Sequence, residues 1–168
     1  MPTFSACLSR PLETHLKRLI LAATTIASLV TTLPAVAQVF AKPEDAVRYR
    51  VGAFVVMQNH LGRIGAMVKG NAPFDGAVAS ANADIVEMMS RLPYQAFVEG
   101  TAGKGDKDSA KPNIWTERPK FDAAAKALQG ETSKLAAAAK LNNLEALKTA
   151  YGATTKACKA CHDDFRQR

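Results

Sequence analysis

The 168-residue chain has few residues that could build a metal or redox site. It contains three cysteines, three histidines and one tryptophan. Cys158 and Cys161 lie close together near the C-terminus, whereas Cys7 lies near the N-terminus. A structural zinc site usually needs four Cys or His ligands in two pairs, so this small set argues against one. A thioredoxin-like cysteine pair belongs near the first strand of a βαβ unit, and these cysteines end a helical pattern instead.

The chain also lacks an apolar run long enough to cross a membrane. Residues 19–33 form an apolar stretch of about fifteen residues that contains threonines and stops at Pro34, whereas a spanning helix needs about 20. Basic residues precede this stretch, and the small-residue sequence Ala-Val-Ala follows it, directly before Gln38. That order predicts a secretory signal peptide over residues 1–37, cleaved after Ala37. We therefore expect the mature chain in the periplasm, without a membrane attachment.

Charge of one sign is not concentrated anywhere along the chain. The leader holds three of the 22 basic and one of the 15 acidic residues, so residues 38–168 keep 19 and 14, a net charge of +5. Without a block of Lys or Arg there is no case for a nucleic-acid partner. This modest balance would at most steer encounters with an acidic redox partner protein. The length of residues 38–168 suits a single domain with one core.

No segment alternates apolar and polar residues over any length, so nothing predicts a β-strand. Ala, Leu, Lys and Glu dominate periodic segments at about 43–69, 74–91, 118–140 and 144–166, which predicts four helices. The long connection before the third helix is too rich in glycine and charge for regular structure, and it is longer than a bundle usually needs. These features predict an all-α protein, an antiparallel four-helix bundle over residues 38–168.

Three-and-four spacing of apolar residues predicts which face of each helix is buried. In the last helix both cysteines fall on the apolar stripe, so a group attached to them would lie inside the bundle. The predicted core residues are Val47, Val51, Phe54, Leu61 and Val68 in the first helix, Val78, Ile85, Met88 and Leu92 in the second, Phe121, Leu128 and Leu135 in the third, and Leu144, Leu147, Tyr151, Thr154, Cys158, Cys161 and Phe165 in the fourth.

The most informative pattern is Cys158-Lys159-Ala160-Cys161-His162. Cys-x-x-Cys-His is the pattern by which haem is attached covalently through two thioether bonds, with the histidine as an axial ligand of the iron. Six residues follow His162, and none is Met or His. A sixth ligand to the iron therefore cannot come from downstream. The motif predicts one covalently attached haem c.

Several segments together with this motif resemble the cytochrome c′ family. They are Phe40 to Val47, Arg50, Leu92-Pro93, Ile114-Trp115 and the terminal Cys-x-x-Cys-His. The resemblance covers essentially residues 38–168. It implies a four-helix bundle, a homodimer packed through the first two helices, and a high-spin, five-coordinate haem. It also implies binding of nitric oxide and carbon monoxide, with oxygen bound poorly or not at all.

The resemblance also implies roles for single residues. Tyr94 falls where some relatives have Trp, and Phe97 matches an aromatic residue at the haem edge. The implied haem contacts are thioether bonds at Cys158 and Cys161, the axial iron ligand His162, a proximal arginine at Arg166, a propionate-binding arginine at Arg50, and a distal apolar residue at Phe54. Phe54 is bulkier than the leucine that is common at this position.

These residues favour a gas-binding protein that sequesters nitric oxide and takes part in electron transfer. With His162 below the iron and apolar Phe54 above, we expect no hydrogen-bond donor for a polarised ligand on the distal side. Met57 leaves an alternative open, because a thioether at the iron would make a low-spin, six-coordinate electron carrier. We expect His60 to face solvent. An enzyme, such as a peroxidase or nitric oxide reductase, is not expected, because the distal helix has no His/Arg pair for acid-base chemistry.

Overall fold

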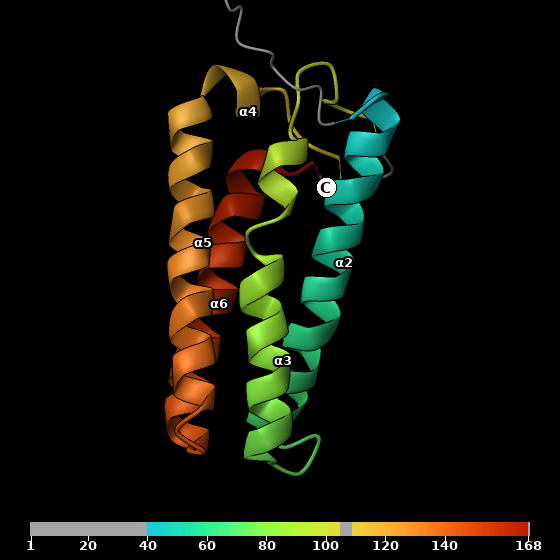
Figure 1. The fold of residues 1–168 in the computed structure, drawn as a ribbon. Helices are drawn as coiled ribbons and strands as arrows, with labels where there is room; N and C mark the ends of the chain where they lie inside the picture. Colours follow the sequence, from blue (N-terminus) through green and yellow to red (C-terminus); the bar gives the residue numbers. More distant parts are fainter. Residues whose placement is uncertain (1–39, 105–108, 168) are drawn as a thin grey trace, which may run out of the picture. The chain divides into compact units, whose positions relative to one another are not determined.

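The computed structural model describes residues 40–104 and 109–167 of the chain, which form an antiparallel bundle of four long helices (Figure 1). No β-strand occurs within these residues, so the predicted all-α fold is confirmed. The predicted leader, residues 1–37, lies outside the described residues. The long helices are α2 (Pro43–Val68), α3 (Gly76–Met89), α5 (Arg118–Ala139) and α6 (Leu144–Phe165).

The connection between α3 and α5 is not wholly irregular, which corrects the prediction. It contains a 3-10 helix, η1 (Pro93–Ala96), and a single helical turn, α4 (Asn113–Thr116). A proline stands at the beginning of each of them, Pro93 as the first residue of η1 and Pro112 as the N-cap of α4. The fixed φ of proline suits the first position of a helix, and its missing N–H leaves no bond unmade there.

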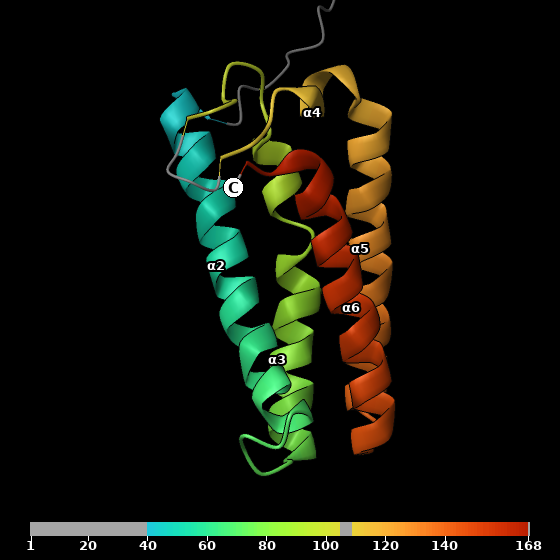
Figure 2. The same cartoon turned by 180° about the vertical axis from the view of Figure 1, so that it is seen from behind.

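Each long helix packs against the next one along the chain, and α6 returns to pack against α2. Figure 1 looks onto α3 and α5, and Figure 2 looks onto α2 and α6. Gly65 allows α2 to approach α6 closely, because a Cβ at Gly65 would lie 2.5 Å from the Tyr151 hydroxyl oxygen. The C-terminal part of α6 lies toward the end of the bundle that carries η1 and α4.

Local signals set the helix ends close to their expected positions. Gly70, with φ of 76°, ends α2, because glycine adopts this left-handed conformation without a steric penalty. Asp75 is the N-cap of α3 and accepts a hydrogen bond from the Val78 N–H at 3.0 Å, so α3 begins two residues later than predicted. Asn143 caps α6 in the same way through the Ala146 N–H.

The predicted stripes are confirmed in α5 and wrong in part in α2 and α3. Phe121, Leu128 and Leu135 are each at most 3% exposed. In contrast Val51 and Met88, which the spacing placed in the core, are 50% and 64% exposed. Both α2 and α3 have apolar residues on several faces, so spacing alone did not identify the buried face. The buried residues are Ala46, Arg50, Ala53, Met57, Ile64, Gly65 and Met67 in α2, and Ala79, Asn82, Ala83 and Val86 in α3.

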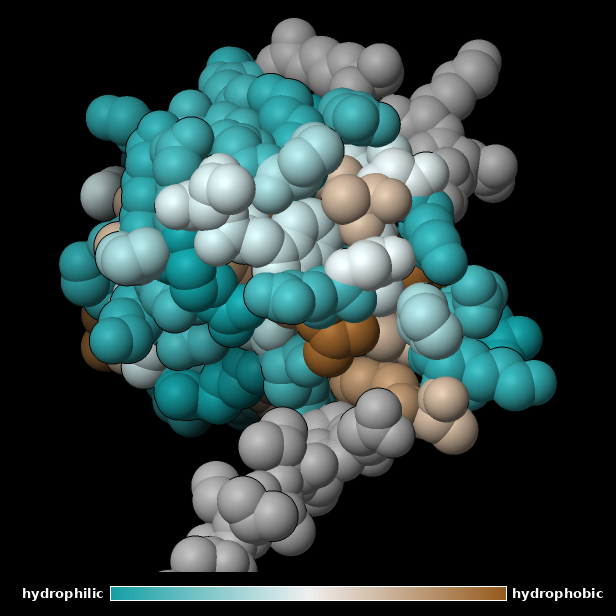
Figure 3. Space-filling model, turned by 90° about the horizontal axis from the view of Figure 1, so that it is seen from above, coloured by the Kyte–Doolittle hydropathy of each residue, from teal (hydrophilic) through white to brown (hydrophobic). Residues whose placement is uncertain are grey.

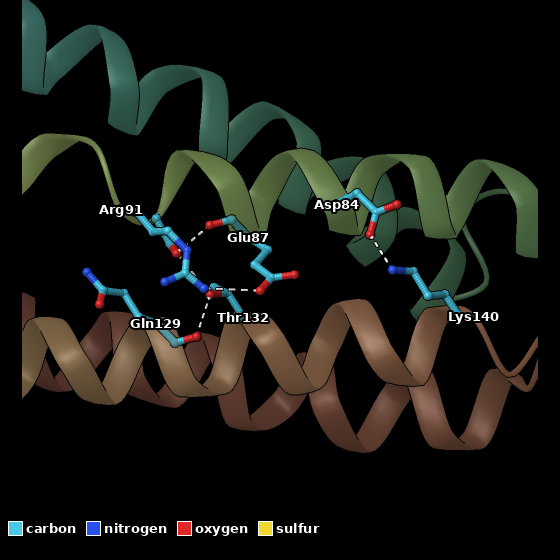
Figure 4. A network of polar contacts seen from close by, with 7 residues as sticks. Asp84, Glu87, Arg91, Gln129, Thr132 and Lys140 are labelled. Carbon is cyan, nitrogen blue, oxygen red and sulfur yellow. Dashed lines mark hydrogen bonds and ion pairs between the residues drawn. The ribbon is translucent and has the colours of Figure 1, made fainter.

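Polar contacts join α3 to α5 along the side shown in Figure 4. The buried hydroxyls of Ser90 and Thr132 lie 3.0 Å apart, and each also lies within hydrogen-bond distance of a carbonyl of its own helix. Because each hydroxyl has one proton, at most two of these three contacts are hydrogen bonds at the same time. Toward the other end of the two helices, Lys140 Nζ lies 3.1 Å from an Asp84 carboxylate oxygen. Each of these interior hydroxyls has hydrogen-bond partners, so its burial leaves no polar group unpaired.

His60 does not face solvent, contrary to the prediction. It is half-buried, and its Nδ1 lies 2.8 Å from the side-chain oxygen of Asn82, a residue of α3 that is only 5% exposed. The Asn82 amide nitrogen donates to the Val78 carbonyl, so the Asn82 oxygen is the acceptor for the His60 N–H. The packing of α3 against this side of α2 covers the imidazole. His60 is therefore a bridge between two helices.

Among the described helices, none combines the length and the apolar character that a membrane-spanning segment requires.

Candidate functional site

A cavity of about 460 Å³ lies between α2 and α6, toward the end of the bundle that carries the long connection. Its volume falls within the roughly 300–1,000 Å³ of cofactor and ligand sites. Figure 3 looks down onto this end, where hydrophilic residues cover most of the face and a few apolar residues reach the surface between them. The cavity is lined mainly by apolar and aromatic side chains, with a few polar groups among them.

The α6 wall of the cavity carries the whole Cys-x-x-Cys-His motif. Cys158, Cys161 and His162 line it together, as do Phe165 and Arg166. The helical period places both cysteines on this wall, as predicted from the apolar stripe. Neither cysteine forms a disulfide, and both side chains are half-buried. The structure thus brings both thiols and the imidazole to one apolar space.

The apolar surroundings of the two thiols raise their pKa values. Burial raises the pKa of Cys158, and burial, together with Cys158 and Asp164, raises the pKa of Cys161 to about 11. Both thiols are therefore protonated near neutral pH.

Arg166 lies beside His162. Its Nη1 is 3.4 Å from the imidazole Nδ1, although α6 ends at Phe165 and Arg166 has an extended backbone. The Arg166 N–H still donates to the His162 carbonyl oxygen at 3.1 Å, so the two residues keep the spacing of one helical turn. The Arg166 and His162 side chains therefore lie on the same side of the end of α6.

The α2 wall lies opposite and presents Phe54, Met57 and Leu61 to the cavity. Met57 is 6% exposed and also belongs to the main core cluster, where Ile64 and Leu128 are neighbouring members. The exposed Val51 and Val55 line the cavity at its rim. His60 is absent from the lining among the described residues, and the polar side chains that α2 contributes to the cavity are those of Arg50 and Gln58.

Arg50 is the buried cation of the cavity. It is 4% exposed and donates hydrogen bonds to the Ala96 carbonyl at 3.2 Å, the Thr101 hydroxyl at 2.7 Å and the Thr101 carbonyl at 2.9 Å. Its guanidinium carbon lies 4.6 Å from the centre of the Phe97 ring. Burial lowers the pKa of Arg50, yet arginine stays protonated in proteins. No acidic side chain within residues 40–104 and 109–167 forms an ion pair with it.

Five aromatic rings, which we call the aromatic cluster, form another part of the wall. They are Phe54, Tyr94, Phe97, Phe121 and Phe165, from α2, η1, the residue after η1, α5 and α6. Phe121 is central, because its ring centroid lies 4.8 Å from Phe97, 5.3 Å from Phe165 and 5.8 Å from Tyr94. Edge-to-face contacts of this kind are favourable, so the cluster holds four elements around the cavity.

The long connection closes the cavity by binding to the end of α6. The Lys111 N–H donates to the Phe165 carbonyl at 2.9 Å, and the Gln167 N–H donates to the Ser109 carbonyl at 2.8 Å. Ala110, between these positions, lines the cavity and forms an antiparallel bridge with Arg166. A helical bundle does not need so long a connection. Here residues of the connection bind the end of α6 and hold the segment after His162 in place.

Sequence reasoning placed six candidate residues, and all six line this one cavity: Cys158, Cys161, His162, Arg166, Arg50 and Phe54. It missed Thr101, Ser109 and Ala110, because they lie in the connection where no periodic pattern exists. The isolated Thr101 offered no signal, since only the fold brings it to Arg50, 51 positions earlier in the chain.

A four-helix bundle with a Cys-x-x-Cys-His sequence on the wall of its internal cavity defines a class, the c-type cytochromes built on a helical bundle. The family model described as Cytochrome C′ matches residues 45–166. Cytochrome c′ of Alcaligenes xylosoxydans xylosoxydans is 44% identical over 129 residues, which cover 77% of this chain and 98% of that protein. The chain belongs to the cytochrome c′ family.

Solved structures agree with this assignment. The crystal structure of cytochrome c′ from Rubrivivax gelatinosus matches with a TM-score of 0.71 and 44% identity, covering 76% of this chain and 99% of that chain. Structures of leucine variants of cytochrome c′ from Alcaligenes xylosoxidans match with the same TM-score and identity over 77% of this chain, and over 98% and 99% of those chains. One is a nitric oxide complex, and another has carbon monoxide bound.

Proposed function

We propose that this protein is a periplasmic gas-binding cytochrome with one covalently attached haem c and a five-coordinate, high-spin iron. The observation that carries the proposal is the cavity with His162 on one wall and Phe54 on the opposite one. An imidazole on one side and a phenyl ring on the other offer the iron one strong ligand and leave its other side for a small molecule. Nitric oxide and carbon monoxide are the proposed ligands.

The residues of the cavity fit a haem. Two thiols stand three residues apart on the same helical face, the imidazole follows directly, and the remaining lining is largely apolar. When bound, the haem supplies the iron that takes up the diatomic gas. Cys158 and Cys161 would hold it by thioether bonds, and His162 would be the axial ligand. Arg166 lies beside the imidazole and would provide a polar contact that helps to orient His162.

Arg50 would bind a propionate group of the haem. A buried cation is costly unless it is paired and hydrogen-bonded, and Arg50 has oxygen acceptors but no carboxylate partner among the described residues. A carboxylate at the cavity edge would complete its set of partners, because guanidinium and carboxylate groups form strong charge-assisted hydrogen bonds.

Relatives support the choice of ligand, since cytochrome c′ structures from Alcaligenes xylosoxidans hold nitric oxide and carbon monoxide. A protein of this kind would sequester nitric oxide, and its haem would also allow electron transfer with a redox partner protein. We propose binding rather than catalysis. Within the described residues the α2 wall of the cavity presents no His/Arg pair for the acid-base steps of a peroxidase, although a weak nitric oxide reductase or peroxidase side activity is compatible with an open iron.

The second candidate is a low-spin electron carrier with Met57 as the sixth ligand, because Met57 lines the cavity. Its place in the core cluster favours a packing role instead. We expect the Met57→Leu and Met57→Ala variants to keep the high-spin optical and resonance Raman spectra of the haem-loaded wild type. Leucine preserves the volume of methionine, so it separates loss of the sulfur from loss of packing.

If the wild-type spectra are six-coordinate and low-spin in both oxidation states, with no nitric oxide binding, the gas-binding proposal is wrong. A change from low to high spin in Met57→Leu would then assign the sixth ligand to the Met57 sulfur. High-spin spectra in all three proteins would support the open coordination site.

A homodimer through α2 and α3 is the proposed assembly. Apolar side chains emerge on both helices, among them Val56, 40% exposed, and Met88, 64% exposed. Charged substitutions there should disrupt an apolar contact between two copies. We expect the haem-loaded wild type to sediment as a dimer and the Val56→Lys/Met88→Lys variant as a monomer. The control is Leu141→Lys, which changes a side chain that is 67% exposed at the α5–α6 turn and should leave the dimer intact. A monomeric wild type would contradict the proposal.

A further inference from the structure

Tyr94 is a polar residue of the cavity that neither the motif nor the charge pattern singled out. It lies in η1, is half-buried, and lines the cavity together with Phe54. Its ring meets the Phe54 ring edge-on, with centroids 6.3 Å apart and an interplanar angle of 86°. Tyr94 therefore stands beside the residue that forms the wall opposite His162.

Two other polar side chains that line the cavity, those of Arg50 and Ser109, have hydrogen-bond partners in the chain. Arg50 is bonded to Ala96 and Thr101, and the Ser109 hydroxyl donates to the Gln167 side chain at 2.6 Å. On the outside of the bundle, the Tyr49 hydroxyl accepts a hydrogen bond from Gln95 at 2.9 Å. No residue within 40–104 or 109–167 hydrogen-bonds with the Tyr94 hydroxyl, although its ring contacts Phe54, Phe97 and Phe121.

The phenol keeps its proton in this environment. Burial raises the pKa of Tyr94 well above the ordinary value of 10, and negative charge at Cys161 and Cys158 would raise it further. Burial is the largest cause and does not depend on the thiols, so the conclusion also holds once they are bonded. Tyr94 is thus a neutral hydrogen-bond donor near neutral pH.

We propose that the Tyr94 hydroxyl donates a hydrogen bond to the diatomic ligand on the Phe54 side of the cavity. This inference rests on the proposed gas-binding function and adds a specificity-determining residue to it. It also replaces the expectation from sequence that this side has no donor. A donor there favours ligands whose outer atom gains negative charge on binding, because a hydrogen bond to a polarised acceptor is stronger than one to a neutral acceptor.

The test is the Tyr94→Phe variant of the haem-loaded, ferrous protein with carbon monoxide as the probe. Phenylalanine keeps the ring and its contacts with the aromatic cluster, so only the hydroxyl is lost. A hydrogen bond of ordinary net strength predicts carbon monoxide dissociation about two- to tenfold faster in the variant. The infrared C–O stretching frequency should rise, because the donor draws electron density toward the ligand oxygen. Tyr49→Phe and Tyr151→Phe are the controls, since neither tyrosine lines the cavity.

The outcomes separate this inference from the function on which it rests. A wild type that binds no carbon monoxide would overturn both. A wild type that binds it, with the same C–O frequency in Tyr94→Phe as in the two controls, would overturn the hydrogen bond alone. Faster dissociation with an unchanged frequency would indicate a wider entry path and would also contradict the proposal. A raised frequency together with faster dissociation, confined to Tyr94→Phe, would support it.

Discussion

Replacing both Cys158 and Cys161 by serine is expected to abolish covalent haem attachment completely. Each thioether bond forms when a thiol adds across a vinyl group of the haem, with sulfur bonded to one carbon and hydrogen to the other. A serine hydroxyl does not undergo this addition. The described part of the chain holds no further cysteine that could take over, and both thiols face the cavity. Haem staining on a denaturing gel and the intact mass of the exported protein measure the result.

The single variants Cys158→Ser and Cys161→Ser serve as matched controls for this loss. Each keeps one thiol on the cavity wall, so we expect a reduced fraction of chains with attached haem rather than none. The wild-type mass should correspond to residues 38–168 plus one haem, which also measures cleavage after Ala37. Covalent haem in the double variant, or a wild type without it, would contradict the assignment of the motif.

Phe121→Ala is expected to lower the free energy of unfolding by about 3–5 kcal/mol, the usual cost of removing a buried phenyl ring. Phe121 is 1% exposed and contacts the rings of Tyr94, Phe97 and Phe165. Its loss removes the centre of the aromatic cluster, because η1, α5 and α6 meet through this side chain. Urea denaturation of the haem-loaded protein, followed by circular dichroism, measures the change.

Leu141→Ala is the comparison for this effect, since the leucine side chain is 67% exposed. Substitutions at such sites usually change the free energy of unfolding by no more than about 0.5 kcal/mol. Phe121→Leu, which retains part of the buried volume, should fall between the two. If Phe121→Ala were no less stable than Leu141→Ala, the aromatic cluster would not contribute to holding the helices around the cavity.

Most of the fold followed from local patterns. The period of α5 identified Phe121, Leu128 and Leu135 as core residues, and the turn residues Gly70 and Asn143 ended or began helices where expected. Such signals are readable because each acts within a few residues of its own position. The same reasoning failed in α2 and α3, where valine and methionine occur on several faces and the neighbouring helices decide which face is buried.

In the candidate site, too, some features followed from local patterns and others depended on the packing of several helices. The prediction that Arg50 binds a haem propionate came from the resemblance, and the position of its guanidinium depends on Thr101 in a connection without periodicity. His60 was expected in solvent because its position was judged from α2 alone, whereas Asn82 of α3 covers and binds it. The position of a side chain between helices depends on both helices, so one periodic pattern was not sufficient.

The sequence by itself determined the reactive groups of the candidate site. Cys158, Cys161 and His162 lie so close in sequence that one helix places all three on the same wall of the cavity. It also determined the bundle, since four periodic segments with short turns have few other ways to bury their apolar faces. Only the tertiary structure decided what surrounds the motif. The partners of Arg50, the aromatic cluster and the Tyr94 ring beside Phe54 come from separate elements, and only the packing of these elements brings them to the same cavity.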